Sequence, residues 1–548
     1  MSMRRALLFI VVLAAGCGGE SGPTPPPPPP AGPPAADLGC TGTNPVSLEQ
    51  GESVTLDGAT TACVRLASGS ADREYLVMAY SASGDPSGVS GSVLWRTRSA
   101  GTPAAAPAPA TSTELIDPAS QFHAMLRGRE RMAASGGARV PRAAPAALPP
   151  SVGDQRTFQA CLGAACSAFA PVDVVARYVG RSVVLFTDGV LPADGFSADD
   201  YTRFGRLFDE RLYPVDTAAF GRESDIDRNG LVYVVMTGAV NRLCPDVGGI
   251  VTGYFFGPDL EPASAGSNGA EVFFGLVPDF GGQYGCRLTK DFVERVLPGT
   301  FVHEFQHMIS FNQHVLTRHG PPESTWLNEG MSHFAEELAG RRTPADYCVL
   351  NDCLSQFAFN DVTNAYRYLF ATENRYLVMP DGSTGALAER GAAWLFVRWL
   401  ADQFGGTGDA FTRSLLATDK LGAANVTAAT GVPFDRLVGE WHLANYLDDL
   451  AAFTPVNPRL RYTSWNWRTT FAELKPQSPS QYPKVFPLEP DSTTGRYDRT
   501  VTLRAGSGRH LRVQVAAGAQ PVDFRLSSVD QGLPAAALAA RVAVARIK

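Results

Sequence analysis

The pentapeptide His303-Glu304-Phe305-Gln306-His307 constrains this chain of 548 residues more than any other feature. Apolar residues recur around it at helical spacing, so a helix is predicted over Phe301–Leu316 with Thr300 as its cap. Positions i and i+4 share one face of a helix, which lets His303 and His307 offer two neutral imidazoles to one metal ion beside Glu304. The rival interpretation is a helix with two structural histidines.

A catalytic zinc ion takes three protein ligands and leaves one position open, so a third ligand is required. The downstream candidates are His314, His319, His333 and Glu329. His314 continues the first helix, and neither His319 nor His333 has a recognised spacing. Glu329 lies on a second predicted helix, Ser324–Leu338, which would bring it opposite the histidines if the two helices are antiparallel.

Three segments, His303–Ile309, Thr325–Ser332 and Gly391–Phe396, resemble the hyicolysin family of gluzincin-type zinc metallopeptidases. The resemblance covers roughly residues 170 to 450. It implies an α+β fold, with a zincin-like catalytic domain that has a mixed sheet and a helical second half. It also implies that His303, His307 and Glu329 hold Zn²⁺ and that Glu304 is the catalytic general base.

The chain departs from the family pattern at two places. Gluzincins of the thermolysin kind have Asp four residues after the ligand glutamate, where this chain has His333. We therefore expect Glu336, two helical turns after Glu329, to orient a ligand histidine instead. Arg390 stands where the family pattern has Tyr, so the donor for the oxyanion stays open. The candidates are Arg390, Tyr366, Tyr368 and Tyr376.

The N-terminus has the pattern of an export signal. Residues 1–16 combine two arginines, an apolar stretch and small residues, as signal peptides do. Ala14-Ala15-Gly16-Cys17 resembles a bacterial lipobox, which implies an acylated Cys17 and, because Gly18 follows, an outer-membrane or cell-surface location. An ordinary signal peptide is the alternative. Leu7–Ala15, the only long apolar run, is too short to span a membrane.

The eight cysteines after Cys17 suit an oxidising compartment. No C-x-x-C pattern occurs, which disfavours a cysteine metal site. We predict disulfides between neighbours in the sequence, although eight cysteines allow about 105 connectivities. The predicted pairs are Cys40–Cys63, Cys161–Cys166, Cys244–Cys286 and Cys348–Cys353.

The pattern of elements predicts a catalytic unit flanked by two small β-sandwich modules. The expected divisions are a signal peptide 1–16, a lipid-anchored Pro-rich spacer 17–39, a β module 40–99, an Ala/Pro-rich linker or pro-segment 100–150, a metallopeptidase domain 151–455, a connector 456–489 and a second β module 490–548. A polar helical stretch interrupts the linker near Ser120–Ala134. Further helices are expected over Ala198–Leu212, Gly391–Phe404 and Phe434–Leu447, and strands over Ser182–Thr187, Leu231–Thr237, Glu271–Leu276, Thr500–Leu503, Leu511–Val515 and Val522–Leu526.

A second metal motif is weaker. The stretch 225–230, Asp-Ile-Asp-Arg-Asn-Gly, places oxygen ligands at alternate positions, as in the first half of a calcium loop. Met236 replaces the glutamate of the twelfth position, which excludes an EF-hand. A solvated turn before a strand is the alternative to a structural Ca²⁺ site.

Composition and motifs exclude several function classes. The net charge of −7 leaves no basic surface for nucleic acid, and neither a G-x-S-x-G elbow nor a phosphate loop occurs. The sequence predicts an exported, lipid-anchored zinc endopeptidase that acts on peptides or proteins. The alternative is a surface binding or adhesion lipoprotein with an inactive zincin-like domain, which the intact Glu304 disfavours.

Overall fold

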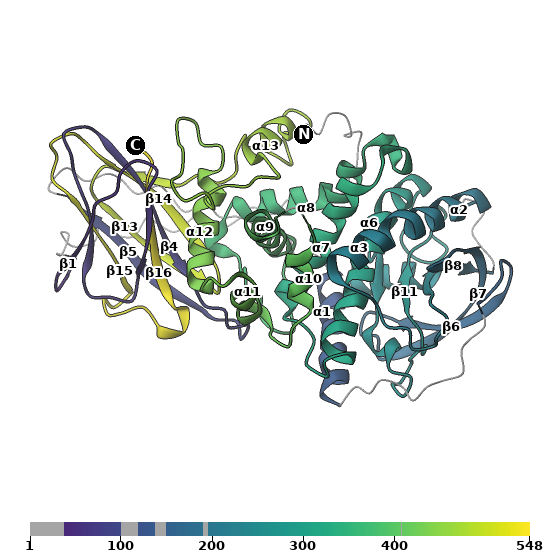
Figure 1. The fold of residues 1–548 in the computed structure, drawn as a ribbon. Coiled ribbons are helices and arrows are strands. Elements are labelled where there is room, and N and C mark those ends of the chain that lie inside the picture. Colours follow the sequence, from purple (N-terminus) through teal and green to yellow (C-terminus); the bar gives the residue numbers. More distant parts are fainter. Residues whose placement is uncertain (1–37, 100–118, 137–148, 190–194, 407) are drawn as a thin grey trace, which may run out of the picture.

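The computed structural model describes residues 38–99, 119–136, 149–189, 195–406 and 408–548, and all structural statements below concern this part of the chain. The signal peptide, Cys17 and the spacer up to residue 37 lie outside it. Among the described helices, none has the length and apolar composition needed to cross a bilayer. Helices and strands mix as an α+β fold, with a sheet layer, a helical layer and a β-sandwich arranged in a row (Figure 1).

A six-stranded mixed sheet forms one end of the molecule, in the order β10-β11-β9-β8-β7-β6 (Figure 1). Its strands are β6 (Gln155–Leu162), β7 (Ala168–Val179), β8 (Val183–Asp188), β9 (Val232–Met236), β10 (Gly253–Phe255) and β11 (Val272–Gly275). The central strands β8, β9 and β11 are parallel, and β10 runs antiparallel at the edge. Every residue of β9 is buried, as expected of an apolar parallel strand covered on both faces.

Helices cover this sheet and continue into a helical layer. The main ones are α2 (Ala198–Leu207), α3 (Tyr213–Phe220), α6 (Lys290–Phe311), α7 (Thr325–Arg342), α8 (Cys353–Leu369), α9 (Leu387–Phe404), α10 (Ala410–Leu416), α11 (Gly422–Thr430) and α12 (Phe434–Leu447). The expected start at Thr300 is wrong, because Thr289 caps α6 through its side chain and Pro298 is accommodated inside the helix. The expected helix Ala198–Leu212 begins where predicted, and a π turn over Phe208–Leu212 joins α2 to α3.

Two glycines let the helices of this layer approach closely. An added Cβ at Gly391 on α9 would lie 2.2 Å from the Asn364 carbonyl carbon of α8. One at Gly330 on α7 would lie 2.8 Å from the Ala393 carbonyl oxygen of α9. Both distances are shorter than packed atoms tolerate, so glycine at these positions sets how tightly α7, α8 and α9 pack.

The two terminal β segments form one sandwich, so the expectation of two separate modules is wrong. Strand β5 lies hydrogen-bonded between β13 and β15, and β4 lies between β14 and β16. Each segment alone would leave strand edges unpaired, and pairing between the segments removes those edges. The strands are β1 (Thr43–Val46), β2 (Ser53–Asp57), β3 (Cys63–Leu66), β4 (Arg73–Ser81), β5 (Ser90–Arg98), β12 (Asp491–Thr493), β13 (Tyr497–Arg504), β14 (Gly508–Val515), β15 (Val522–Ser528) and β16 (Ala540–Arg546).

Both expected connecting segments contain packed structure. In the segment 100–150, the predicted helical stretch is helix α1 (Ala119–Ser135), which packs on the body of the protein. Residues 100–118 and 137–148 of that segment lie outside the described part. The segment 456–489 contains α13 (Trp467–Leu474), and the ring of Trp467 lies 5.6 Å from that of Trp394 on α9.

The four predicted cysteine pairs lie at disulfide distance. Their Cα–Cα separations are 5.5 Å for Cys40–Cys63, 4.7 Å for Cys161–Cys166, 5.9 Å for Cys244–Cys286 and 5.2 Å for Cys348–Cys353. These separations fall in the range that disulfide geometry allows.

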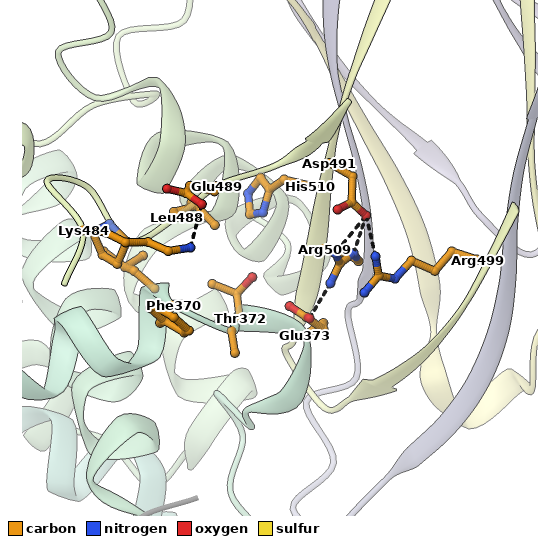
Figure 2. A pocket seen from close by; sticks show the side chains of 13 residues that line it. Phe370, Thr372, Glu373, Lys484, Leu488, Glu489, Asp491, Arg499, Arg509 and His510 are labelled. Carbon is orange, nitrogen blue, oxygen red and sulfur yellow. Dashed lines mark hydrogen bonds and ion pairs between the residues drawn. The ribbon is translucent and has the colours of Figure 1, made fainter. Parts of the chain in front are cut away.

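A cavity of about 170 Å³ marks the joint between the helical layer and the sandwich (Figure 2). Arg509 of β14 crosses this joint, since it binds Asp491 at 2.8 Å and also Glu373 after α8. Arg499 adds a second contact to Asp491, at 3.1 Å. The charges of the wall are matched among themselves, so we interpret the cavity as part of a structural joint.

Candidate metal centre

Helices α6 and α7 bring the three predicted ligands together. The Nε2 atoms of His303 and His307 are 3.2 Å apart. The carboxylate oxygens of Glu329 lie 3.7 Å from each of these nitrogens. Ligand atoms about 2.0–2.1 Å from a tetrahedral zinc ion are separated by roughly 3.3 Å. The three side chains therefore have nearly the spacing that a shared zinc ion requires.

The protonation state of His307 also suits a metal ligand. His307 and Glu329 are each only 2% exposed. Burial lowers the pKa of His307 well below its ordinary value, and the charge of Arg127 lowers it further. The imidazole is therefore neutral, which is the form that donates a lone pair to zinc.

Glu304 lies beside the candidate ligands on α6. Burial raises its pKa, while the charges of His303 and Arg127 and a hydrogen bond from the Phe255 N–H partly offset the rise. That N–H donates to Oε2 of Glu304 over 2.8 Å. A carboxyl whose pKa is raised toward neutrality is suited to accept and return a proton.

Glu336 contacts the outer nitrogen of a ligand histidine. Its Oε1 lies 2.8 Å from Nδ1 of His303, which leaves Nε2 to face the other ligands. The same oxygen lies 2.9 Å from Nδ1 of His333, which also contacts Asp361 at 2.9 Å. Burial acts to lower the pKa of His333, but Asp361 and Glu336 outweigh it and raise that pKa to about 10. His333 is therefore a cation in a network that supports His303.

The cluster of His303, His333 and Glu336 is a less suitable metal set, although its atoms are also close together. Its contacts of 2.8 and 2.9 Å have hydrogen-bond length, shorter than the separation of two ligands on one zinc ion. The remaining candidates are remote from the ligand set. His314 faces Glu323 at 3.9 Å, and His319 lies in an exposed turn after α6.

The oxyanion candidates have other partners. The Tyr366 hydroxyl donates to the Lys484 carbonyl at 3.0 Å, and the Tyr376 hydroxyl donates to the Gly88 carbonyl at 3.3 Å. Tyr368 is buried and stacks on Trp441, with ring centroids 5.5 Å apart. Arg390 binds Ser120 at the start of α1, with 3.3 Å between Nη2 and Oγ. None of these contacts joins one of the four side chains to His303, His307 or Glu329.

Helix α1 contributes side chains that the sequence analysis did not assign to the site. The charge of Arg127 acts on Glu304 and His307, and that of Glu130 interacts with both Glu304 and Glu329. His123 lies near His303, and burial lowers its pKa well below the ordinary value. A signal was present in the sequence, because Phe122 and Leu126 are four residues apart and mark a buried helix face.

A second acidic group gathers at the predicted calcium motif. Asp225 and Asp227 of the loop before β9 lie close to Glu271, which immediately precedes β11. One oxygen from each of the three carboxylates lies within 4.8 Å of the others. The sequence motif identified the two aspartates but not Glu271, because the pairing of β9 with β11 supplies the third member.

Comparison with known proteins relates part of the chain to a metalloprotease. No family model matches the chain. Neutral metalloprotease ShpI of Staphylococcus hyicus is 28% identical over 165 residues, which make up 30% of this chain and 35% of that protein. The chain thus spans about a third of the length of this relative. The similarity supports a distant relationship to a metalloprotease for this part of the chain and nothing finer.

Proposed function

We propose that this chain is an exported, lipid-anchored zinc endopeptidase of the gluzincin type. The observation that carries the proposal is the spacing of the candidate ligands: the Nε2 atoms of His303 and His307 are 3.2 Å apart, and each lies 3.7 Å from a carboxylate oxygen of Glu329. Glu304 adjoins them with a raised pKa. The similarity to a metalloprotease supports the same chemistry from an independent direction.

The chain's own residues have separate tasks in this reaction. A zinc ion held by the two histidines and Glu329 would supply a Lewis acid for the peptide carbonyl and for the attacking water. Glu304 accepts the proton of that water at a carboxylate oxygen and returns it to the leaving amine. Glu336 keeps His303 in the orientation and tautomer that present Nε2 to the ligand set.

Replacement of the general base tests this assignment. Glu304→Gln removes the proton acceptor but keeps the shape of the side chain. We expect it to retain zinc and to lower the rate of casein hydrolysis by about 100- to 10,000-fold. Glu294→Gln makes the same change on α6 at a partly exposed position, and it should leave both quantities unchanged.

The ligand variants should behave differently. His303→Ala and Glu329→Ala should lose zinc and activity together, as measured by metal analysis of the purified proteins. Full casein cleavage by the Glu304→Gln protein, or stoichiometric zinc in the Glu329→Ala protein, would contradict these roles. A wild-type protein that binds zinc but cleaves no member of a broad protein panel would favour a binding lipoprotein instead.

The proposed anchor has its own test. The lipobox-like residues 14–17 motivate a mature chain that begins at acylated Cys17. Cys17→Ser should move the protein from the membrane fraction to the soluble fraction after export. A Cys17→Ser protein that stays in the membrane fraction would rule out this anchor.

A further inference from the structure

The acidic cluster beside β9 has unsatisfied oxygens. Glu271 is 1% exposed, and its Oε2 has no hydrogen-bond partner among the described residues. Its other oxygen accepts from the Ser224 hydroxyl at 2.6 Å and from the Ile226 N–H at 2.9 Å, which fixes the carboxylate toward the loop. Oδ1 of Asp227 is also buried without a partner. Buried carboxylate oxygens without partners are costly, and a bound cation would compensate them.

The surrounding contacts keep these oxygens in place. Oδ1 of Asp225 accepts from the Gly230 N–H at 3.0 Å, and Oδ2 of Asp227 accepts from the Asn229 amide at 2.6 Å. Burial raises the pKa of Glu271 to about 7, because little positive charge compensates this carboxylate. The charge of Arg156 partly offsets that of Asp227.

We propose that Asp225, Asp227 and Glu271 bind a calcium ion that joins the 224–230 loop to the start of β11. All three side chains offer carboxylate oxygens, the hard ligands that Ca²⁺ prefers, and nitrogen or sulfur ligands are absent from this cluster. When ionised, the three carboxylates carry more negative charge than the charge of Arg156 offsets, so a divalent cation would stabilise them. The site lies where the paired parallel strands β9 and β11 begin. A bound ion would therefore stabilise this end of the two strands.

Titration of the full-length protein with calcium alone tests this site. We expect calorimetry to give one binding site in the micromolar to millimolar range, together with a higher unfolding temperature. Glu271→Gln should weaken binding by at least about tenfold, because it removes the buried ligand charge. Glu261→Gln changes another partly buried carboxyl outside the cluster and should bind calcium like the wild type.

Two results would overturn the calcium site. One is a wild-type protein with neither binding heat nor a shift in unfolding temperature at millimolar calcium. The other is a folded Glu271→Gln protein that binds calcium as tightly as the wild type. If Glu271→Gln does not fold, Asp225→Asn applies the same test at an exposed position. Zinc content measured in the same samples separates loss of calcium from loss of the proposed catalytic metal.

An independent observation concerns helix α1, which packs beside β10 and carries charges that act on the candidate metal centre. Phe122 and Leu126 are each 1% exposed, and the ring of Phe122 lies 5.4 Å from that of Tyr254 on β10. Arg127 and Glu130 form an ion pair at 3.1 Å with both side chains 3% exposed. Burial of two charges costs free energy, so the buried Arg127–Glu130 pair suggests that α1 has a role beyond stability.

Helix α1 also contacts the edge strand to which an extended peptide would bind. Strand β10 is at the edge, and Phe255 has its N–H bound to Glu304. The Phe255 carbonyl accepts from Nη2 of Arg127 at 3.5 Å. Peptides commonly bind by adding a strand to such an edge. Glu304 is only 2% exposed, so a substrate carbonyl has no room beside the base in this arrangement of the helices.

We infer that α1 is a built-in inhibitory helix that covers the substrate-binding region beside Glu304 and β10; this inference rests on the proposed peptidase function. The strands before α1 pair with the strands at the end of the chain, so the cover remains tethered to the folded protein. Helix α1 must move away from β10 before a peptide can bind. The regulation is therefore an equilibrium between a state in which α1 covers the substrate-binding region and a state in which this region is open.

A variant that loosens α1 away from the proposed ligands tests this inference. The double substitution Phe122→Ala and Leu126→Ala should speed removal of zinc by a small chelator at least about tenfold, and should raise the rate of peptide hydrolysis. Met132→Ala removes a 58% exposed side chain from the same helix and should change neither rate. Arg131→Ala, which removes a 3.2 Å contact to Thr325 on α7, replaces the double variant if that protein does not fold.

The outcomes separate the cover from the peptidase function. Unchanged zinc removal, or slower hydrolysis in a folded, zinc-loaded variant, would overturn the cover, since α1 would then not block the site. Faster zinc removal without peptide cleavage by either protein would support the cover and contradict the proposed peptidase function.

Discussion

The candidate metal centre and the β-sandwich differ in how far apart their parts lie in the sequence. His303, His307 and Glu329 lie within 27 residues on two consecutive helices, α6 and α7. In the sandwich, Trp95 packs between Tyr497 and Phe524, with ring centroids 5.6 and 5.5 Å away. Local helical periodicity places the first set of residues, whereas only the folded chain as a whole brings the second set together.

This difference implies different sensitivities. A change at the metal centre should alter chemistry with little effect on folding, because α6 and α7 are held by many buried apolar residues besides the ligands. A change in the sandwich core should alter stability without altering the chemistry per folded molecule. The largest effect is therefore expected for a core aromatic residue of the sandwich.

Trp95→Ala should lower the free energy of unfolding by about 3–5 kcal/mol, because Trp95 is fully buried and its removal leaves a large cavity. Denaturant unfolding measures this change. Val529→Ala, at a 56% exposed position of the sandwich, is the control and should have a negligible effect. Zinc content per folded molecule should equal that of the wild type. Loss of zinc from folded Trp95→Ala protein would show that the sandwich supports the metal centre.

Glu336→Gln should have a smaller effect and should act on the metal rather than on the fold. The amide weakens the contact to Nδ1 of His303, so zinc affinity should fall by about 10- to 100-fold. Competition with a chelating dye measures the affinity, and Glu294→Gln is the matched control. An unchanged affinity in the Glu336→Gln protein would remove the positioning role of Glu336.

The same contrast explains which features the sequence could predict. Helix α12 has the predicted bounds, and the strand predicted over Val522–Leu526 lies within β15. The spacing of His303 and His307 predicted two ligands on one helix face, the family resemblance implied Glu329 as the third ligand, and the sequence also identified Glu336 as a partner. Helix periodicity and motif spacing are local, so they are readable before the fold is known.

Features that depend on distant pairing were not readable. The strand patterns predicted β segments at both ends but carried no information on their partners, so two modules were expected where one sandwich exists. Glu271 was missed because it joins Asp225 and Asp227 only through the pairing of β9 with β11. The Ala/Pro-rich composition of residues 100–150 made the segment around α1 look like a linker, although the apolar face of α1 is buried and Phe122 packs against Tyr254 of β10.

The effect expected to be smallest at neutral pH concerns the contact between the sandwich and the helical layer, and it grows only as the pH falls. Nε2 of His442 on α12 donates to the Gly506 carbonyl at 2.9 Å, and Nε2 of His510 on β14 donates to the His442 carbonyl at 3.0 Å. Burial lowers the pKa of His442 to about 3 and that of His510 to about 4. The neighbouring Arg509 adds positive charge that lowers the pKa of His510 further. Both imidazoles are therefore neutral in the folded protein at neutral pH.

The pH dependence follows from these pKa values. Unfolded histidines have a pKa of about 6.5, so below this pH the unfolded state binds more protons than the folded state. The two neutral histidines contribute their full stabilisation of the folded state above about pH 6.5. As the pH falls toward about 4, the free energy of unfolding decreases by roughly 1 kcal/mol per pH unit for each histidine. His510→Gln keeps a hydrogen-bond donor near the position of Nε2. It should make the free energy of unfolding, measured in urea, less dependent on pH over this range. The exposed control His319→Gln should leave this pH dependence unchanged. If the His510→Gln protein loses stability with falling pH as steeply as the wild type, the acid-sensitive contact lies outside this interface.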